Sequence, residues 1–215
     1  MAMIVAVSRA LLRNKFAIRP ISSAVLLCVL VLCGCHHEIA VDTAPLDSAG
    51  MNYDAIKQLK SANISTAEVA EVAKARQGGL PDSACIAVFQ VYRSRKQRFD
   101  VGDAAAGLIG AGISPTTVVA LAGLNQLGPE SGELLAMRLA GIPDETILEV
   151  ARHHAQGHPV LSGAALARMK NAGMRDATLL ELARRGVPDS ESANIVTLRH
   201  HGFNDAEILR HFTGS

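Results

Sequence analysis

The chain has 215 residues, a formal net charge of +1 and a slightly positive mean hydropathy. Four cations and no acid precede Cys35, which leaves seventeen Lys and Arg against twenty Asp and Glu in the rest of the chain. This balance argues against nucleic-acid binding, which needs a basic surface. The chain has no Trp, and only six aromatic residues follow Cys35, so stacking platforms for sugars or bases are scarce.

Residues 1–34 have the arrangement of a secretory signal. Arg9, Arg13, Lys15 and Arg19 precede an apolar run over 21–33, which is the order of a basic region and a hydrophobic region in exported proteins. The run is shorter than the roughly 20 apolar residues that a spanning helix needs. We therefore prefer an export signal to an uncleaved membrane anchor.

The stretch Leu32-Cys33-Gly34-Cys35 at the end of this run resembles the lipobox of bacterial lipoprotein precursors. Leu32 matches the aliphatic position, Gly34 the small residue before the acceptor, and Cys35 the acceptor; Cys33 stands where Ala, Ser or Thr is more usual. The resemblance covers roughly the first 37 residues and implies cleavage before Cys35, which would carry a diacylglyceryl group and an N-acyl chain. His36, in place of Asp, then points to the outer membrane, facing the periplasm. Ordinary cleaved secretion is the alternative.

Residues 35–50 are small and polar and show neither helical nor strand periodicity. We interpret them as the lipidated cysteine followed by a flexible tether. His36 and His37 raise the question of a metal site, but two neighbouring histidines without further ligands nearby do not make one.

Beyond this segment the sequence repeats. In five places Gly or Asn follows a Leu or Met by four residues and precedes an apolar residue; these are Asn63, Gly112, Gly141, Gly173 and Gly202. The pattern is typical of the Schellman motif, in which a left-handed residue ends a helix and the next residue contacts the last turn. Each of these positions therefore predicts the end of one helix.

Helix starts are expected soon after these ends. Ser65 with Glu68, and Asn204 with Glu207, have the spacing of capping boxes. Apolar residues then recur six, seven and ten residues after the glycine, which predicts one apolar stripe on each short helix.

A second series of glycines alternates with the first and comprises Gly79, Gly128, Gly157 and Gly186. Both series have a period of about 30 residues, and each contains one interval of 49 residues. Two series with the same irregularity predict one insertion, near residues 89–103.

These patterns predict an all-α domain over residues 51–215, an α-solenoid-like array of about eleven short helices arranged as hairpins. Isolated helices of this length are marginal in water, whereas stacked hairpins bury their apolar stripes in a continuous core. A compact helical bundle is the alternative fold.

The predicted insertion carries the one dense basic cluster, which consists of Arg93, Arg95, Lys96 and Arg98. Such a cluster suits contact with an anionic group, such as a lipid head group or an acidic protein face. The alternative is a solvated helix end with Tyr92 and Phe99 packed inward.

The other candidates for chemistry are weaker. The histidines near the predicted helix ends, His153, His154, His158, His200, His201 and His211, do not match metal-ligand spacing, so we predict no metal and no cofactor. Cys85 lies on a predicted apolar stripe and is expected to be a buried thiol. Glu130 and Glu133 were considered because some helical envelope lipoproteins cleave peptidoglycan with one glutamate, but both lie at a predicted helix start, where acids are common.

We therefore expect a bacterial envelope lipoprotein without enzymatic activity. The lipid on Cys35 would hold it at the membrane, and the helical domain would bind an envelope protein. The alternatives are a peptidoglycan hydrolase that uses Glu130 or Glu133, and a structural domain that self-associates.

Overall fold

The structure is a computed structural model that describes residues 41–212. Within these residues every regular element is helical and no strand occurs. Twelve α-helices form six consecutive hairpins: α3 (Ala44–Ser48) with α4 (Tyr53–Ser61), α5 (Thr66–Gln77) with α6 (Asp82–Ser94), α7 (Gly102–Gly110) with α8 (Pro115–Gly123), α9 (Ser131–Leu139) with α10 (Asp144–Ala155), α11 (Gly163–Asn171) with α12 (Asp176–Arg184), and α13 (Ser192–His200) with α14 (Asp205–His211). A 3₁₀ turn, η1 (Asp189–Glu191), precedes α13.

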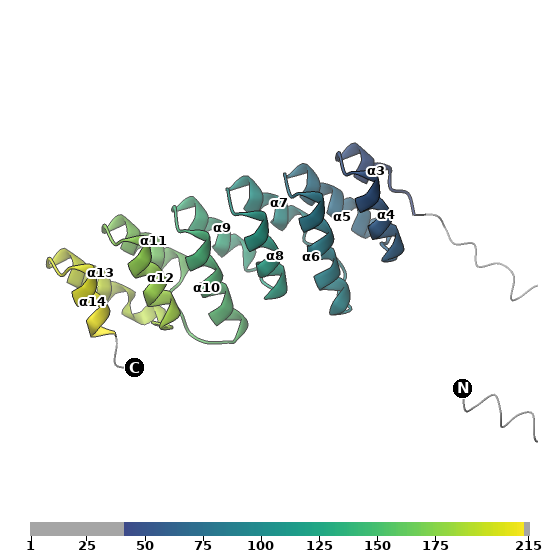
Figure 1. Ribbon diagram of the computed structural model, residues 1–215. Helices are drawn as coiled ribbons and strands as arrows, with labels where there is room; N and C mark the ends of the chain where they lie inside the picture. The colour runs from purple at the N-terminus through teal and green to yellow at the C-terminus, as the bar shows by residue number, and fades with distance from the viewer. Residues whose placement is uncertain (1–40, 213–215) are drawn as a thin grey trace, which may run out of the picture. The chain divides into compact units, whose positions relative to one another are not determined.

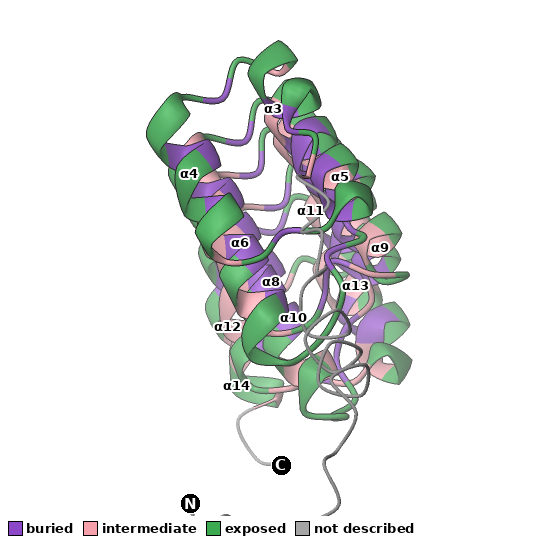
Figure 2. Ribbon diagram, turned by 90° about the vertical axis from the view of Figure 1, so that its right-hand side faces the viewer, coloured by how far each residue is buried: buried purple, intermediate pink, exposed green. Residues whose placement is uncertain are grey.

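The hairpins stack into an elongated array (Figure 1). Each helix packs against the helices two places before and after it in the chain, for example α5 against α7 and α6 against α8. The odd-numbered helices therefore form one layer and the even-numbered helices a second, as the view along the array shows (Figure 2). The prediction of an all-α array of short hairpins is confirmed.

Every helix from α3 to α13 is followed by one residue in the left-handed conformation; these residues are Gly50, Asn63, Gly79, Lys96, Gly112, Asn125, Gly141, Gly157, Gly173, Gly186 and Gly202. At each of them the backbone forms both hydrogen bonds of the Schellman motif. After α9, for example, the Gly141 N–H donates to the Arg138 carbonyl at 2.8 Å and the Ile142 N–H to the Met137 carbonyl at 3.0 Å. The five predicted Schellman endings are confirmed, and the structure adds six more.

The predicted insertion near residues 89–103 is wrong. The left-handed residues that end the odd-numbered helices lie 29 to 33 residues apart throughout, and so do those that end the even-numbered helices. Lys96, with φ of 58°, and Asn125, with φ of 62°, occupy positions where other hairpins have glycine. A pattern based on glycine misses both residues. It therefore placed Asn63, which follows the even-numbered α4, in one series with Gly112, which follows the odd-numbered α7.

The predicted boundary between tether and domain at residue 50 is also wrong, because α3 lies inside the segment interpreted as flexible. Leu46 is fully buried, and α3 packs against α5. The helix has five residues, too few to show a periodicity, so its stability depends on burying Leu46 against the next hairpin.

The second helices of the first five hairpins alternate in length, with 9 residues in α4, α8 and α12, 13 in α6 and 12 in α10, whereas α14 has 7. Over these five hairpins the repeat is therefore two hairpins long. Equivalent left-handed residues two hairpins apart, such as Gly79 and Gly141 or Gly141 and Gly202, are separated by 62 and 61 residues. In Figure 1 the longer helices α6 and α10 extend beyond their neighbours at the same edge of the array.

The core runs between the two layers. One position of the even-numbered helices, six residues after the preceding glycine, is at most 4% exposed in all six hairpins; it holds Ile56, Cys85, Val118, Ile147, Leu179 and Ile208. Cys85 is fully buried, as predicted. Burial, the largest influence, raises the pKa of its thiol to about 12.

Candidate functional site on the surface of the helical array

Many charged side chains of the array bind the neighbouring hairpin. Asp144, the first residue of α10, accepts a hydrogen bond from the Ser114 backbone N–H at 2.8 Å. The same contact joins Asp82 to the Asn52 N–H at 3.0 Å and Asp205 to the Arg175 N–H at 3.3 Å. Each pair is 30 residues apart, so these carboxylates tie one even-numbered helix to the start of the preceding one.

These contacts affect the ionisation of the carboxylates. Burial, the largest single influence, raises the pKa of Asp144, but hydrogen bonds from Ser114 and Thr117 and the charge of Arg138 together leave it below its ordinary value. The pKa of Asp205 is lowered in the same way, with burial outweighed by Arg175, Thr178 and the charge of Arg199.

Glu133 makes a comparable contact in the layer of odd-numbered helices. Its carboxylate accepts the Gly163 N–H at 2.7 Å, as Glu71 accepts the Gly102 N–H at 3.0 Å. A Cβ atom on Gly163 would lie 2.7 Å from the Met137 side chain, so the close approach of α9 and α11 requires glycine there. Glu133, which was considered as a catalytic residue, therefore holds α11 of the next hairpin.

Glu130 precedes α9, is exposed, and helps to line a hollow of about 360 Å³. Arg98 and Asp100, from the segment between α6 and α7, line the same hollow. The structure thus separates the two candidate glutamates: Glu133 bonds to the backbone of the next hairpin, whereas Glu130 faces solvent beside a second carboxylate.

Two members of the basic cluster bind the array itself. Arg93 donates to the Asn63 carbonyl and to the Glu68 carboxylate, the latter at 3.1 Å, and its guanidinium lies 5.1 Å from the centre of the Phe89 ring. Arg95 donates to two carbonyls at the end of α8, with 2.8 Å to that of Ala122.

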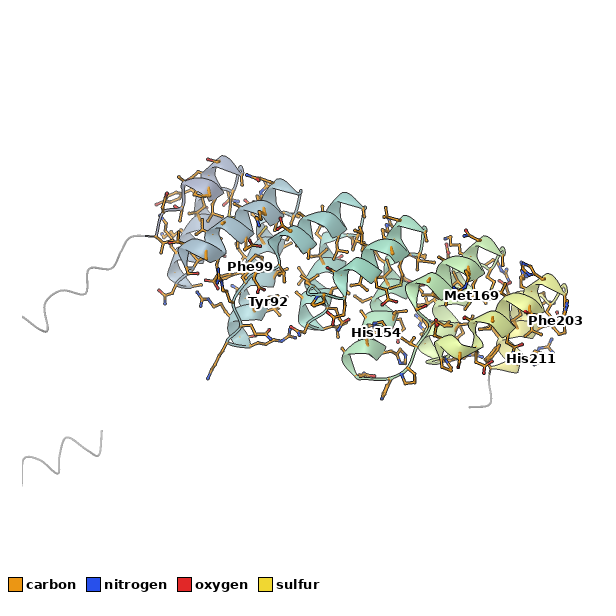
Figure 3. The ribbon with its side chains drawn as sticks, turned by 180° about the vertical axis from the view of Figure 1, so that it is seen from behind. Tyr92, Phe99, His154, Met169, Phe203 and His211 are labelled. Carbon is orange, nitrogen blue, oxygen red and sulfur yellow. The ribbon has the colours of Figure 1, made fainter. Side chains whose placement is uncertain are left out.

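The other two members, Lys96 and Arg98, are exposed. Lys96 is the left-handed residue after α6. Tyr92 and Phe99 point inward, with ring centroids 5.8 Å apart (Figure 3). Contact with an anionic group stays a prediction. All four members of the cluster are exposed, but the guanidinium groups of Arg93 and Arg95 are already engaged within the array.

The histidines lie largely where the pattern placed them. His153 and His154 are in the last turn of α10, and His200 is in the last turn of α13. His153 packs against Gly186, where an added Cβ would be 3.1 Å from the ring. Within residues 41–212, no group of three or more His, Cys, Asp or Glu side chains is placed to hold a metal ion.

The even-numbered helices from α6 to α14 carry a row of half-buried apolar side chains, four of which pack against the edge of the core. It lies seven residues after the preceding glycine and consists of Ile86, Val119, Leu148, Leu180 and Leu209, which we call the apolar row. The member on α8 lies in the stretch 104–129, which contains no Asp, Glu, Lys or Arg. The sequence pattern places these positions on the apolar stripe, and the structure leaves them half-buried.

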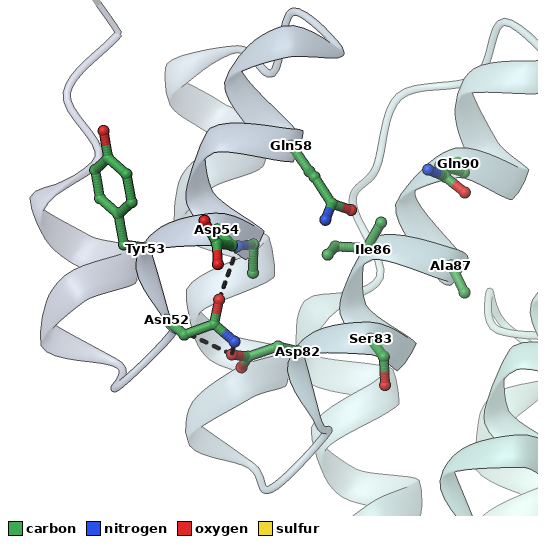
Figure 4. A pocket seen from close by; sticks show the side chains of 10 residues that line it. Asn52, Tyr53, Asp54, Gln58, Asp82, Ser83, Ile86, Ala87 and Gln90 are labelled. Atoms are coloured by element: carbon green, nitrogen blue, oxygen red, sulfur yellow. Dashed lines mark hydrogen bonds between the residues drawn. The ribbon is translucent and has the colours of Figure 1, made fainter.

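The apolar row begins at a hollow of about 560 Å³ between α4 and α6 (Figure 4). Ile86 lines this hollow together with Tyr53, which is 76% exposed, and with Asp54 and Gln90. Its lining contains two carboxylates and no cation. Asp82 is already paired with Arg76 at 2.5 Å. The hollow and the apolar row together form a surface that offers apolar contacts along several hairpins and the Asp54 carboxylate as an acceptor for a basic group at one end.

No family model, no curated protein and no solved structure matched the chain. Within residues 41–212, no helix combines the length and the apolar character needed to cross a bilayer. The predicted lipidation site Cys35 and the recognition residues Leu32, Cys33 and Gly34 lie outside the described residues.

Proposed function

We propose that the protein is a membrane-anchored bacterial envelope lipoprotein whose helical array is a non-catalytic scaffold for protein–protein interaction. The anchor would be the lipid on Cys35, and the array would face the periplasm from the outer membrane. The basic and apolar regions before Cys35 and the lipobox-like Leu32-Cys33-Gly34-Cys35 support the location. Lipid anchorage confines the array to a surface and raises its effective concentration near partners there.

The observation that carries the interaction is the apolar row with its adjoining hollow. Stacked-repeat proteins bind partners through extended surfaces that cross several repeats, and this row crosses five hairpins. The side chains of the row are half-buried, and the apolar surface that they leave accessible is of the kind found at interaction sites of soluble domains. A partner helix with an apolar face and a basic residue near Asp54 has the complementary chemistry.

Site-specific crosslinking in the intact envelope tests this proposal. A photoreactive residue at Ala120, beside the apolar row on α8, should capture a protein partner. The same residue at Ala193, which is exposed on the odd-numbered layer, should not capture it. Leu148→Glu, which places a charge within the row, should abolish the crosslink at Ala120. Equal capture from Ala120 and Ala193, or capture that survives Leu148→Glu, would reject this surface as the binding site.

The second candidate is a peptidoglycan hydrolase that uses Glu130, and the hollow that Glu130 shares with Asp100 supports it. Two carboxylates at a shared hollow are the minimum that glycoside hydrolysis needs. The discriminating assay is digestion of purified peptidoglycan by the Cys35→Ser chain and by the same chain with Glu130→Gln. Digestion that is lost in the second would establish the hydrolase in place of the scaffold.

A further inference from the structure

The first turn of each even-numbered helix places one side chain beside the apolar row. This position is four residues after the preceding left-handed glycine and three residues before the position of the row, and residues three apart on a helix share a face. In chain order it holds Asp54, Ser83, Thr116, Glu145, Ala177 and Ala206. Among these six positions carboxylates therefore occur only on α4 and α10, with two hydroxyl side chains between them.

The carboxylates of Asp54 and Glu145 have no partner in the array. Both side chains are exposed, and neither forms an ion pair or a side-chain hydrogen bond within residues 41–212. By contrast, Asp82 and Asp144, the first residues of α6 and α10, bind the preceding hairpin. Asp54 and Glu145 are therefore available to cations of another molecule.

Nearby cations of the array are directed elsewhere. Lys57, on α4, forms no ion pair with Asp54 among the described residues, and it does not line the hollow between α4 and α6 that Asp54 lines (Figure 4). Arg152 on α10 and Arg138 on α9 pair with other carboxylates, at 2.6 and 3.7 Å. The two ends of this surface thus carry negative charge that a partner can neutralise.

Between the two carboxylates the apolar row crosses a surface without charges. Residues 83–91 on α6 and 115–123 on α8 contain no Asp, Glu, Lys or Arg. Ile86 and Val119 are the members of the row on these helices, and both are half-buried. The complementary segment therefore has an apolar middle and a cation at each end.

The spacing of the row favours a helix as that segment. The helices α4, α6, α8 and α10 pack in this order, and packed helices lie about 8–10 Å apart. An α-helix laid along the row rises about 10.5 Å in roughly seven residues and returns to the same face. An extended segment covers about 10 Å in roughly three residues, and residues three apart on a strand point to opposite faces. A helix can therefore contact each member of the row with one face, whereas a strand cannot.

The same spacing fixes the distance between the two cations. Asp54 and Glu145 lie on helices that are three steps apart in this layer. Three steps of about 10 Å correspond to roughly 21 residues of α-helix. Beyond α10 the position holds Ala177 and Ala206, so the array offers no third carboxylate there.

We propose that the occupant of the apolar row is an amphipathic helix of a partner protein, with one basic residue near each end, that lies across α4, α6, α8 and α10. Its apolar face contacts Ile86, Val119 and Leu148, and its two cations pair with Asp54 and Glu145. This inference rests on the proposed function, because it specifies the partner of the same surface. The two charge pairs set the position of the helix on the array more than its affinity.

Fluorescence anisotropy of labelled synthetic peptides with the Cys35→Ser chain, at low ionic strength, tests the proposal. The probe is a helix of roughly 28 residues with Leu in heptad spacing on one face, Ala and Gln elsewhere, and two Lys about 21 residues apart. Replacing both Lys by Glu should raise the dissociation constant at least about tenfold, because two attractions become repulsions. Placing the two Lys only about 10 residues apart should weaken binding about threefold, since one of them then reaches no carboxylate.

Charge reversal on the protein provides the matched test. Asp54→Lys and Glu145→Lys should each weaken binding of the two-Lys peptide at least about threefold and strengthen binding of a peptide with one Lys and one Glu. The control is Asp100→Lys, which makes the same change in net charge at an exposed carboxylate beyond the end of α6 and should leave both affinities unchanged. Circular dichroism reports whether each variant folds. If one does not, the peptide substitutions decide the question, because they need no variant at these positions.

Equal affinities of the two-Lys and two-Glu peptides would overturn the proposal, as would an equal effect of Asp100→Lys. If binding does not depend on the peptide charges but is lost in Leu148→Glu, the apolar row remains a binding surface and the basic ends are rejected. Absence of binding by every peptide would also overturn this inference, while crosslinking from Ala120 reports separately on the proposed function.

Discussion

Glu68 is a buried carboxylate, 2% exposed, that four donors surround. It accepts the Ser65 N–H at 2.9 Å, the Ser65 hydroxyl at 2.7 Å, the Arg93 guanidinium at 3.1 Å and the Phe99 N–H at 3.3 Å. Burial, the largest influence, raises its pKa, yet the hydrogen bonds and Arg93 leave it lower than usual. A single residue therefore joins the start of α5 to the end of α6 and the segment that follows it.

Glu68→Ala should lower the free energy of unfolding by about 2–4 kcal/mol, because it leaves buried donors without an acceptor. Urea denaturation followed by circular dichroism measures this change. The control is Glu145→Ala, an exposed first-turn acid of α10, which should cost less than about 1 kcal/mol. Equal losses in the two variants would show that the Glu68 contacts contribute no specific stability.

At the scale of one element, α7 contains glycines with opposite requirements. A Cβ atom on Gly102 would lie 2.2 Å from the Glu71 carbonyl oxygen, a backbone atom that cannot move aside alone. A Cβ atom on Gly107 would meet nothing within 4 Å. Gly102 is therefore required by the close approach of α5. Gly107 lowers the helix propensity of α7, and no neighbouring atom among the described residues requires glycine there.

Gly102→Ala should destabilise the array by about 1–3 kcal/mol through overpacking. Gly107→Ala, five residues further along the same helix, should stabilise it by about 0.5–1 kcal/mol, since alanine has the higher helix propensity. Thermal unfolding of both variants provides the comparison. A loss of stability in Gly107→Ala would mean that its surface has a contact that the described residues do not show.

At the scale of the whole molecule, the pKa values of Glu68, Asp144, Asp189 and Asp205 are all lower than usual. A carboxyl group whose pKa is lowered by folding stabilises the native state above its ordinary pKa, and this contribution is lost as the pH falls through the lowered value. We therefore expect a constant unfolding temperature above about pH 5 and a steep fall below about pH 4. The double variant Asp144→Asn, Asp205→Asn should be less stable at pH 7 and should show a shallower decline in acid. An unchanged slope would assign the acid sensitivity to other groups.

Cys35→Ser should release the protein from the membrane fraction without changing the fold, because it removes the side chain that would carry the proposed lipid anchor. Fractionation of cells that express each form, with circular dichroism of the released chain, measures both effects. Cys33→Ser is the control, because a small residue there fits the lipobox and should preserve anchorage. A Cys35→Ser protein that stays in the membrane fraction would contradict the lipid anchor.

The sequence by itself determined the helical class, the period of about 30 residues and five of the helix ends, because a Schellman motif is a local interaction within one turn. It also identified both capping boxes, Ser65 with Glu68 and Asn204 with Glu207, which the structure contains. These features need no information about distant parts of the chain. The helices and their ends can therefore be predicted from local sequence alone.

Only the tertiary structure decided the phase of the repeat, the start of the domain and the roles of the charged residues. Lys96 and Asn125 adopt left-handed conformations without glycine, and α3 is stabilised by burial against α5. Glu133 and Arg93 bind groups about 30 residues away along the chain, a separation that local patterns do not report. How far the apolar row stays accessible depends on how the hairpins stack, which local patterns do not report.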